Sequence, residues 1–236
     1  MRLICEFIIG AVLLKLPNTH VISIDEKTAI QALERLTSRA SESKGGHIRN
    51  EFEYTRHGTT TLIAALNVEN GKLIEQHLGQ TRDEKDFADF TKKVVSRFPE
   101  MDKIVILSDQ LNTHLSATLV EWIFREEQYC QTELGVKGEF GILKSMKTRM
   151  AFLENPNHRI RFLYTPKHCS WLNPIENWFA KLQRHVIRNG NFTSVKELEN
   201  KILAYGDFYN RCLAKPLKWK FRGFEKNKKL FNLNVQ

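Results

Sequence analysis

The chain has 236 residues, of which 42% are hydrophobic and 27% are charged. This balance provides enough apolar material for one sizeable core and excludes a disordered or fibrous protein. Lys and Arg number 36 against 27 Asp and Glu, and the resulting net charge of +9 suits a polyanionic partner such as nucleic acid without identifying one. The four cysteines are far apart: Cys5, Cys130, Cys169 and Cys212. They form no C-x-x-C pair, which argues against a zinc knuckle or a disulfide framework and fits a reducing, cytoplasmic setting.

Residues 1–19 are interpreted as an N-terminal remnant or linker. They contain an apolar run, Phe7 to Leu14, that superficially resembles a secretory signal. Three features favour a buried helix instead of a signal. They are Glu6 beside the apolar residues, the lack of a small-x-small cleavage site, and a strand that begins near Val21. The run is also too short to span a bilayer, so no membrane partner is expected.

Three stretches in the first half are rich in strand-forming residues and are expected to be strands: 20–25, 60–68 and 72–78. The last two are predicted to pair as a hairpin, because Asn70-Gly71 between them tolerates the positive φ of a tight turn. The polar stretch 37–46 is expected to be a loop. Thr81 and Glu84 have the spacing of a capping box, and the helix that follows should end before Pro99.

The second half adds two predicted strands and three predicted helices. The strands are 103–108 and 159–164, and the helices are 116–127, one opening at Asn173 and one running from Ser194 toward Tyr209. Asn173 is expected to be the N-cap of its helix, with Pro174 in the first helical position. Ser194 and Glu197 form a second capping box. Residues 128–157 are expected to be an irregular, basic insertion.

The helix that opens at Asn173 is predicted to be amphipathic. Its apolar stripe comprises Ile175, Phe179, Leu182 and Val186. The opposite stripe comprises Asn177, Lys181, Arg184 and Arg188. We therefore expect one face of the helix to pack against the core, and Lys181, Arg184 and Arg188 on the other face to bind DNA phosphates.

The order of the predicted elements indicates a fold class. The order is strand, strand, strand, helix, strand, helix, strand, helix. It combines a hairpin with right-handed crossovers. This combination predicts an α/β fold with a mixed sheet of about five strands and helices on its faces. The order is compatible with an RNase H-like catalytic domain over residues 20–210, followed by a basic, aromatic tail over residues 211–236.

Three acidic residues stand where the predicted elements should meet. Asp25 ends the first strand and Asp109 follows the apolar strand 103–108, so both carboxylates emerge at one sheet edge if these strands are parallel neighbours. Glu176 lies in the first turn of a helix that could cross this edge. Carboxylates that converge repel one another unless cations share them, and oxygen ligands select Mg²⁺ or Mn²⁺. Two such ions can promote in-line phosphoryl displacement.

Each acid also has a structural alternative, which spacing alone does not exclude. Asp25 and Asp109 could cap strand ends, and Glu176 could close a capping box or complement the helix dipole. If the carboxylates do hold metal, Asp109→Asn should abolish the metal-dependent cleavage of phosphodiester bonds that such ions promote. It should also leave the metal-free fold unchanged or more stable, because it removes one of several crowded charges.

The three acids belong to longer strings. These are Ser23-Ile-Asp25-Glu-Lys27; Tyr54-Thr-Arg-His-Gly58 with Leu62-Ile-Ala-Ala-Leu-Asn-Val68; Asp109-Gln-Leu-Asn-Thr-His114; and Tyr164-Thr-Pro166 with Ser170-Trp-Leu-Asn-Pro-Ile-Glu176-Asn-Trp-Phe179. With these strings, the chain from about His20 to Trp219 resembles the DDE transposases of mariner-like bacterial insertion sequences. The resemblance implies that Asp25, Asp109 and Glu176 form the catalytic triad. It further implies two Mg²⁺ or Mn²⁺ ions as cofactors and no covalent protein intermediate.

The resemblance also assigns roles to neighbouring residues. Asn112 and His114 would position Asp109 or contact the scissile phosphate, although either could simply cap the helix that follows. Asn173, which belongs to the last string, is a further supporting residue. Trp171 could stack on a flipped base or anchor the core beside the helix start.

The chain departs from the family pattern in three places. Gln110 stands where many relatives have Asn. The separation of Asp109 and Glu176 is longer than in compact relatives because of the insertion 128–157, which is expected either to contact DNA or a partner subunit or to be a solvated loop. Only 24 residues precede Asp25, where family members carry helix-turn-helix units that recognise the inverted repeats, so the chain looks truncated or split.

The leading hypothesis is a transposase catalytic domain that cleaves transposon ends and transfers their 3′-hydroxyls to target DNA, in the cytoplasm of a bacterium and associated with the nucleoid. Its expected partner is double-stranded DNA, with a homodimer and a separate N-terminal DNA-binding chain as further expectations. The tail would add phosphate contacts through Lys215, Lys218, Lys220 and Arg222, unless it is a solvated tail whose aromatic residues pack on the core. The alternatives are a catalytically silent DNA-binding or subunit-binding remnant and a nuclease-like fold that acts on RNA.

Overall fold

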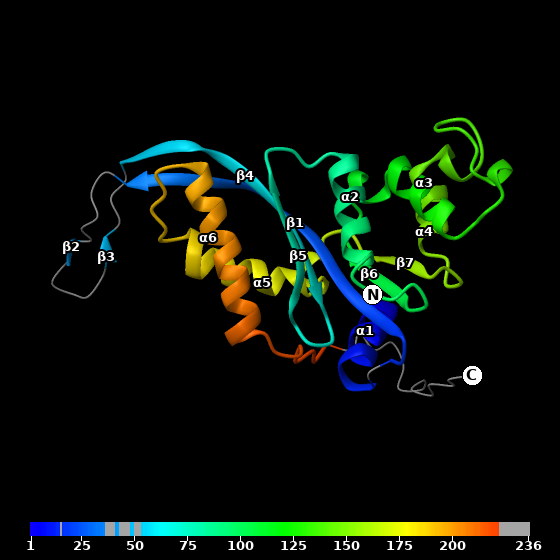
Figure 1. The fold of residues 1–236 in the computed structure, drawn as a ribbon, viewed down its shortest axis with the longest axis horizontal. Helices are drawn as coiled ribbons and strands as arrows, with labels where there is room; N and C mark the ends of the chain where they lie inside the picture. The colour runs from blue at the N-terminus through cyan, green and yellow to red at the C-terminus, as the bar shows by residue number, and fades with distance from the viewer. Residues whose placement is uncertain (15, 36–40, 43–47, 50–52, 222–236) are drawn as a thin grey trace.

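The structure, a computed structural model, describes residues 1–14, 16–35, 41–42, 48–49 and 53–221. Its centre is a five-stranded sheet with the strand order β5-β4-β1-β6-β7 (Figure 1). The strands of this sheet are β1 (Thr19–Arg35), β4 (Tyr54–Asn67), β5 (Leu73–Gly79), β6 (Lys103–Ser108) and β7 (Ile160–Tyr164). A separate pair is formed by β2 (Ser41–Glu42) and β3 (Ile48–Arg49). The large sheet is mixed, because β1 runs antiparallel to β4 and parallel to β6.

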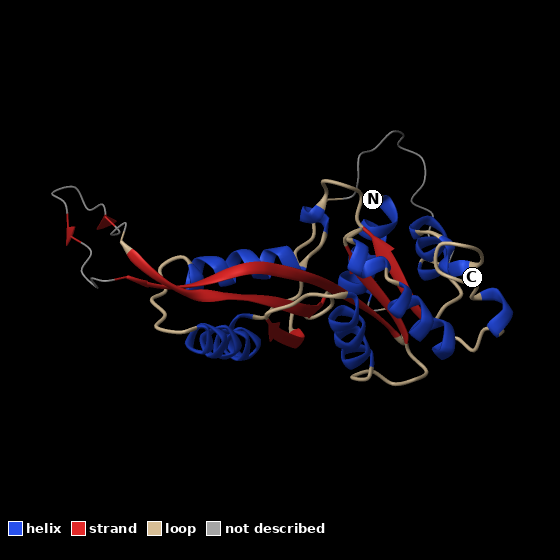
Figure 2. Ribbon diagram, turned by 90° about the horizontal axis from the view of Figure 1, so that it is seen from above, coloured by secondary structure: helices blue, strands red, loops and turns tan. Residues whose placement is uncertain are grey.

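Helices flank the sheet on both sides (Figure 2). The α-helices are α1 (Arg2–Ile9), α2 (Glu84–Val95), α3 (Ala117–Glu126), α4 (Met146–Leu153), α5 (Ile175–Leu182) and α6 (Val195–Phe208). Short 3₁₀ or π-helical turns extend or connect them: η1 (Gly10–Leu14), η2 (Asn112–Leu115), η3 (Gln131–Glu133), η4 (Ile142–Lys144), η5 (Ser170–Leu172), η6 (Gln183–Ile187) and η7 (Tyr209–Leu213). The predicted α/β class, with a mixed sheet of five strands and helices on its faces, is confirmed.

Hydrophobic clusters lie against both faces of β1, because successive side chains of a strand alternate between the faces. Ile22 and Ile24 belong to a cluster that includes residues of α2, α3 and α4. Val21 belongs to a second cluster, which it shares with α1. A third cluster joins α5 and α6 to β4 and to the later part of β1. Neighbouring residues of β1 therefore meet different helices.

β1 and β4 extend beyond the other strands as a two-stranded ribbon (Figure 1). β6 pairs with only the first part of β1, whereas β4 stays paired with it as far as Arg35. The register shifts between Lys27 and Ile30, where Ala29 has a φ of 54°. After this irregularity Ile30 joins the cluster of α5 and α6. The first strand is thus longer than the predicted 20–25, because pairing with β4 carries it through polar residues that lack an apolar pattern.

The predicted hairpin is present as β4 and β5, but its turn and the helix after it differ in detail. The turn has more than two residues: Gly71 N–H donates to Asn67 O (2.9 Å), and Gly71 has a φ of 71°. The N-cap of α2 is Asp83 and not Thr81, so the expected capping box is wrong. The Asp83 carboxylate accepts two backbone N–H groups of the first turn, and a charged acceptor is stronger there than a hydroxyl.

Residues 128–157 are not irregular throughout, contrary to the expectation. Ser145 caps α4 by accepting a hydrogen bond from the Thr148 N–H. The buried residues of this helix are Phe152 and Leu153, adjacent positions at its end. The prediction missed the helix because two adjacent buried residues do not produce the spacing of an apolar stripe. The stretch 37–46 lies mostly outside the described residues.

The buried helix expected near the N-terminus is present as α1. Ile4, Cys5 and Ile8 are buried, and α1 packs against Leu107 of β6 and Leu163 of β7. In the described part of the chain, no helix combines the length and the apolar character needed to cross a bilayer.

Candidate active site

The parallel pairing of β1 with β6 brings Asp25 and Asp109 to the same end of the sheet. Ser23 lies opposite Leu107, and β6 ends at the next residue, Ser108. Asp109 therefore leaves the sheet level with Asp25, as the sequence predicted for parallel neighbours. Asp25 does not end its strand, however, because β1 continues beside β4. The side chain of Asp25 lies where β1 loses its β6 neighbour.

Asn173 fastens Asp25 to the helix that carries Glu176. The Asn173 side-chain N–H donates to Asp25 Oδ2 (3.1 Å) and to the backbone O of Ile24 (3.0 Å). Its Oδ1 accepts a hydrogen bond from the Ser23 hydroxyl. The expectation that Asn173 caps α5 with its side chain is wrong, since its buried amide is engaged by β1 and α5 has no side-chain cap. Asn173 therefore fixes where α5 begins relative to Asp25.

His114 holds Asp109 from the opposite face of the sheet. Its Nδ1 lies 2.7 Å from Asp109 Oδ1, and its Nε2 lies 3.5 Å from Glu26 Oε1. The ring is fully buried and stacks against Phe87 of α2. Burial opposes a charge on this ring, but the two neighbouring carboxylates outweigh burial and raise the pKa of His114 to about 9. A buried imidazolium therefore joins Asp109 to Glu26.

The pKa values of the three carboxylates of the predicted triad do not shift in the same direction. Burial and then the charge of Asp109 raise the pKa of Asp25 to about 6. Burial also acts to raise the pKa of Asp109, but the hydrogen bond and charge of His114 reverse this, and the pKa is lowered. Burial raises the pKa of Glu176, a rise that Lys27 opposes and Asp109 increases. Asp25 and Glu176 are thus both close enough to Asp109 for its charge to raise their pKa values.

The donors at this sheet edge fit a hard divalent cation by their chemistry. They are all oxygens, and the raised pKa values of Asp25 and Glu176 reflect burial and mutual repulsion that a cation would relieve. Among the residues that the structure describes, no three His, Cys, Asp or Glu side chains are grouped tightly enough to hold one ion. The carboxylates are therefore neighbours and are not grouped tightly around a single position.

Three more residues singled out in the sequence lie around this edge. Asn112 is exposed at the start of η2. Gln110 donates a hydrogen bond to the backbone O of Thr165 (3.1 Å), next to the end of β7. Trp171 is half-exposed and its ring packs edge-on against Phe221 at 4.9 Å, so it is not buried as a core anchor.

The predicted basic stripe lies along α5 and η6. Arg184 and Arg188 are exposed, whereas the ammonium of Lys181 lies over the ring of Tyr209, 5.1 Å from its centroid. The apolar side of α5 is buried as predicted, through Ile175, Phe179 and other residues. The two arginines are therefore the more accessible cations of the stripe.

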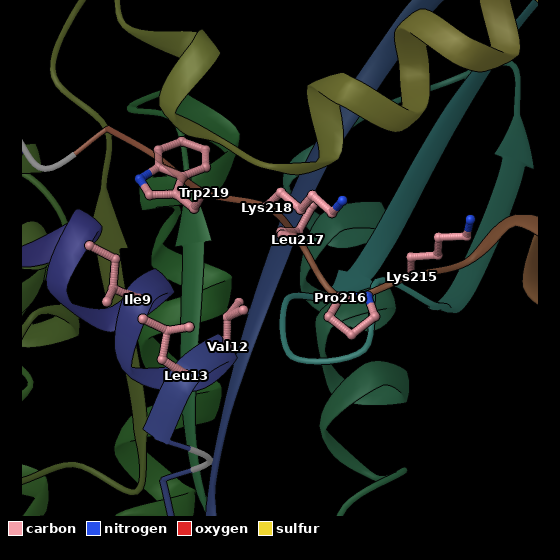
Figure 3. Close-up of a pocket in the computed structure, with 8 residues that line it drawn as sticks. All are labelled: Ile9, Val12, Leu13, Lys215, Pro216, Leu217, Lys218 and Trp219. Carbon is pink, nitrogen blue, oxygen red and sulfur yellow. The ribbon is translucent and has the colours of Figure 1, made fainter.

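The C-terminal lysines lie on a different part of the surface. Lys215 and Lys218 line an apolar groove of about 450 Å³ between η1 and residues 215–219 (Figure 3). Trp219 is partly buried against the cluster that contains α1, and Lys220 is exposed. Arg222 lies outside the described residues. Trp219 thus packs on the core, whereas Phe221 packs against half-exposed Trp171. The predicted phosphate contacts of the tail stay a prediction.

Glu26 and Arg82 were missed by the reasoning from sequence. Arg82 Nη1 lies 3.4 Å from Glu26 Oε2, and the charge of Arg82 acts on Asp109. Glu26 stands next to Asp25, so strand alternation could have placed it on the other face of the sheet. Its partners come from loops distant in sequence, however, and no periodic pattern indicates them.

The sheet order β5-β4-β1-β6-β7, with helices on both faces, is that of an RNase H-like α/β domain. Three solved structures of Mos1 transposase assemblies share this fold. They are the Mos1 mariner paired-end complex with Mn (14% identity, TM-score 0.53), the paired-end complex with the left transposon end (15%, 0.52) and the strand transfer complex (14%, 0.53). Each match covers 89% of this chain and 55–56% of the Mos1 chain. This chain therefore spans little more than half the length of those proteins.

The family follows from a match to the sequence itself. The family model for DDE superfamily endonucleases matches residues 20–199. The chain belongs to the DDE superfamily endonucleases. A search of curated proteins gave no match.

Proposed function

We propose that this chain is a transposase catalytic domain that cleaves DNA strands at transposon ends and joins the freed 3′-hydroxyls to target DNA. The observation that carries the proposal is the meeting of Asp25 and Asp109 at the end of β6, with Glu176 tied to the same place through Asn173. The family and the fold shared with Mos1 transposase agree with this chemistry.

The three carboxylates Asp25, Asp109 and Glu176 would hold Mg²⁺ or Mn²⁺. We expect two ions, because in-line displacement at a phosphodiester uses one ion for the attacking oxygen and one for the leaving oxygen. Such ions, when bound, activate the attacking oxygen and stabilise the leaving oxygen of a phosphodiester. A Mos1 complex contains Mn, which supports a divalent metal here. His114 holds the carboxylate of Asp109 ionised and in place, and Asn173 orients that of Asp25.

The proposed substrate is double-stranded DNA, at the transposon end and at the target. Arg184 and Arg188, with Lys181 and the lysines of the tail, would bind its phosphates without recognising its sequence. The Mos1 assemblies are paired-end and strand transfer complexes, which supports a dimer of this chain on two DNA ends. A separate N-terminal DNA-binding chain would then provide end recognition. In this proposal residues 20–210 are the catalytic domain and 211–236 the basic tail. Residues 1–19, expected from the sequence to be a remnant or linker, provide α1, which packs on the sheet.

A second candidate function follows from the loose grouping of the carboxylates. Because the described residues contain no tight group of three potential metal ligands, the same domain could act as a catalytically silent DNA-binding or subunit-binding remnant. This candidate predicts DNA binding without cleavage at any concentration of Mg²⁺ or Mn²⁺.

A plasmid nicking assay with Mg²⁺ or Mn²⁺ distinguishes the two candidates. The wild-type chain should nick DNA, and Asp109→Asn should lower the rate by about 10³-fold or more, as expected for one member of a catalytic unit. Asp102→Asn is the matched control, since Asp102 precedes β6, pairs with His20 (2.8 Å) and lies at the other end of the strand. Nicking by Asp109→Asn at the wild-type rate, or equal losses in both variants, would contradict the proposed chemistry.

A further inference from the structure

A row of alternating charges connects Asp109 to the molecular surface. Asp109 contacts His114 (2.7 Å), His114 contacts Glu26 (3.5 Å), and Glu26 contacts Arg82 (3.4 Å). The inner members are shielded from water, since the side chains of His114 and Glu26 are 0% and 3% exposed. The side chain of Arg82 is 49% exposed. Arg82 is therefore the cationic end of the row that an anionic ligand from solution can reach, whereas the other end is the carboxylate of Asp109, 38% exposed.

The guanidinium of Arg82 is only loosely engaged. In the described part of the chain, its one ion pair or hydrogen bond joins Nη1 to Glu26 Oε2 at 3.4 Å. Arg97, at the other end of α2, contacts Glu75 at 2.8 Å, and Lys93 contacts the same carboxylate at 3.0 Å. A guanidinium has five N–H donors arranged for two parallel bonds, so most donors of Arg82 are free to bind an oxyanion.

The acids next to Arg82 in sequence do not compete for it. Asp83 Oδ1 accepts the backbone N–H groups of Lys85 and Asp86, and Asp86 Oδ2 accepts from the Thr81 hydroxyl. Both carboxylates are therefore used by the cap of α2. The contacts of Arg82 lead instead through Glu26 and His114 to Asp109. A cation thus stands near the candidate active site with about half of its side chain exposed to solvent.

We propose that Arg82 binds a phosphate of the DNA strand that enters the carboxylate site, and that Glu26 tethers its guanidinium for this contact. A fork of N–H donors suits a phosphodiester because two parallel charge-assisted hydrogen bonds can form. This inference rests on the proposed function and assigns to it a substrate-positioning residue outside the triad.

Salt titration of DNA binding tests the phosphate contact directly. The full chain and its Arg82→Ala and Arg97→Ala variants are titrated with a fluorescent duplex in EDTA, so that no cleavage occurs. Losing one phosphate contact should reduce the slope of log affinity against log salt by about 0.9. Arg82→Ala should show this reduction and bind about tenfold more weakly at low salt, as for one charge-assisted contact. Arg97→Ala removes the same charge away from the carboxylates and should keep the wild-type slope.

Two further variants make the test independent of folding and of net charge. Arg82→Gln replaces the alanine variant if a thermal melt shows that the latter is unfolded. Arg82→Lys keeps the charge and should keep the slope, but it should raise the KM of nicking because an ammonium cannot form the two parallel bonds. Unchanged slopes in Arg82→Ala and Arg82→Gln, or an equal reduction in Arg97→Ala, would overturn the inference.

The failure of this inference is distinguishable from failure of the proposed function. If the wild-type chain does not nick DNA with either metal, the proposed function fails, and the slopes in EDTA still decide whether Arg82 contacts a phosphate. If the wild type nicks DNA and Arg82→Ala equals it in slope and in KM, only the role of Arg82 is wrong.

Discussion

Asp25 and Glu26 are adjacent in β1, yet they face opposite sides of the sheet and meet different partners. On one side, Asp25 contacts the neutral amide of Asn173, and burial with the nearby charge of Asp109 raises its pKa to about 6. On the other side, Glu26 lies between the cations His114 and Arg82. Glu26 and Asp109 therefore each contact a cation on the α2 side. On the α5 side, Lys27 lowers the pKa of Glu176 without reversing its rise. The α5 side is therefore where binding a cation relieves the most repulsion.

The largest effect on stability is expected from His114→Ala. It removes a fully buried ring and the cation shared by Asp109 and Glu26, and it leaves Glu26 with only the 3.4 Å contact to Arg82, which costs about 3 kcal/mol. His20→Ala is the matched control, because the His20 and Asp102 side chains are 24% and 16% exposed and water screens their pair. Its loss should be about 1 kcal/mol. Urea unfolding in EDTA measures the free energy of unfolding of both variants. Equal losses would mean that the buried imidazole on the α2 side stabilises the fold no more than an ordinary partly exposed ion pair.

Asp25→Asn should have the opposite sign in the metal-free protein. The pKa of Asp25 rises from 3.8 to about 6 on folding, so the folded state holds the proton more tightly than the unfolded state. The contribution of Asp25 to stability is then fully present below about pH 4 and is lost, by about 3 kcal/mol, as the pH rises through about 6. Asn carries no charge, so the variant should be more stable than wild type at pH 8 and similar to it at pH 4. Melts of both proteins across this range in EDTA check the sign.

Asp109→Asn sharpens the contrast between the two aspartates. The pKa of Asp109 is lowered through His114, so its ionised form contributes stability that is lost as the pH falls through that lowered pKa. The variant should therefore lose about 1 kcal/mol at pH 7 in the same melts. The sequence led us to expect that Asp109→Asn leaves the metal-free fold unchanged or more stable. The structure leads us to expect this result for Asp25→Asn instead. A gain in stability for Asp109→Asn would restore the original expectation.

Asn173→Ala should weaken metal use with a moderate loss of stability. The amide orients Asp25 and ties it to the start of α5, and loss of such an orienting partner costs about 10–100-fold in metal affinity or activity. The Mg²⁺ concentration needed for half-maximal nicking should rise accordingly. Asn177→Ala, at an exposed position of the same helix, is the control. If both variants need the same Mg²⁺ concentration as wild type, Asn173 has only a structural role.

The smallest effects are expected from the surface cations. Arg184→Ala and Arg188→Ala should each reduce the salt slope of DNA binding by about 0.9 if each side chain contacts one phosphate. Lys181→Ala should change the slope less, because that ammonium already lies over the ring of Tyr209. Lys218→Ala tests whether the groove beside η1 belongs to the same DNA surface. An unchanged slope for this variant would separate the tail from the DNA-binding stripe.

Local pattern was enough to predict much of this protein. The strand 103–108 was predicted with its observed bounds, because an uninterrupted apolar run between turn residues is typical of a strand buried on both faces. The buried face of α5 also follows from the 3.6-residue period. The hairpin was predicted from strand-forming residues on either side of Asn70-Gly71, although its turn is longer than expected. The sequence also indicated that Asp25 and Asp109 would meet at one sheet edge if their strands were parallel neighbours, and the pairing of β1 with β6 meets that condition.

What the tertiary structure alone decided is which partner each polar group meets. The contact between Ser23 and Asn173 joins residues 150 positions apart, and no local pattern indicates it. The same holds for Glu26, whose partners come from the loops before α2 and after β6. Apolar burial leaves a periodic record in the sequence because it follows the geometry of one element. Hydrogen bonds and ion pairs across the core leave no such record, because they depend on where separate elements pack. These contacts are what make the electrostatic surroundings of Asp109 different from those of Asp25.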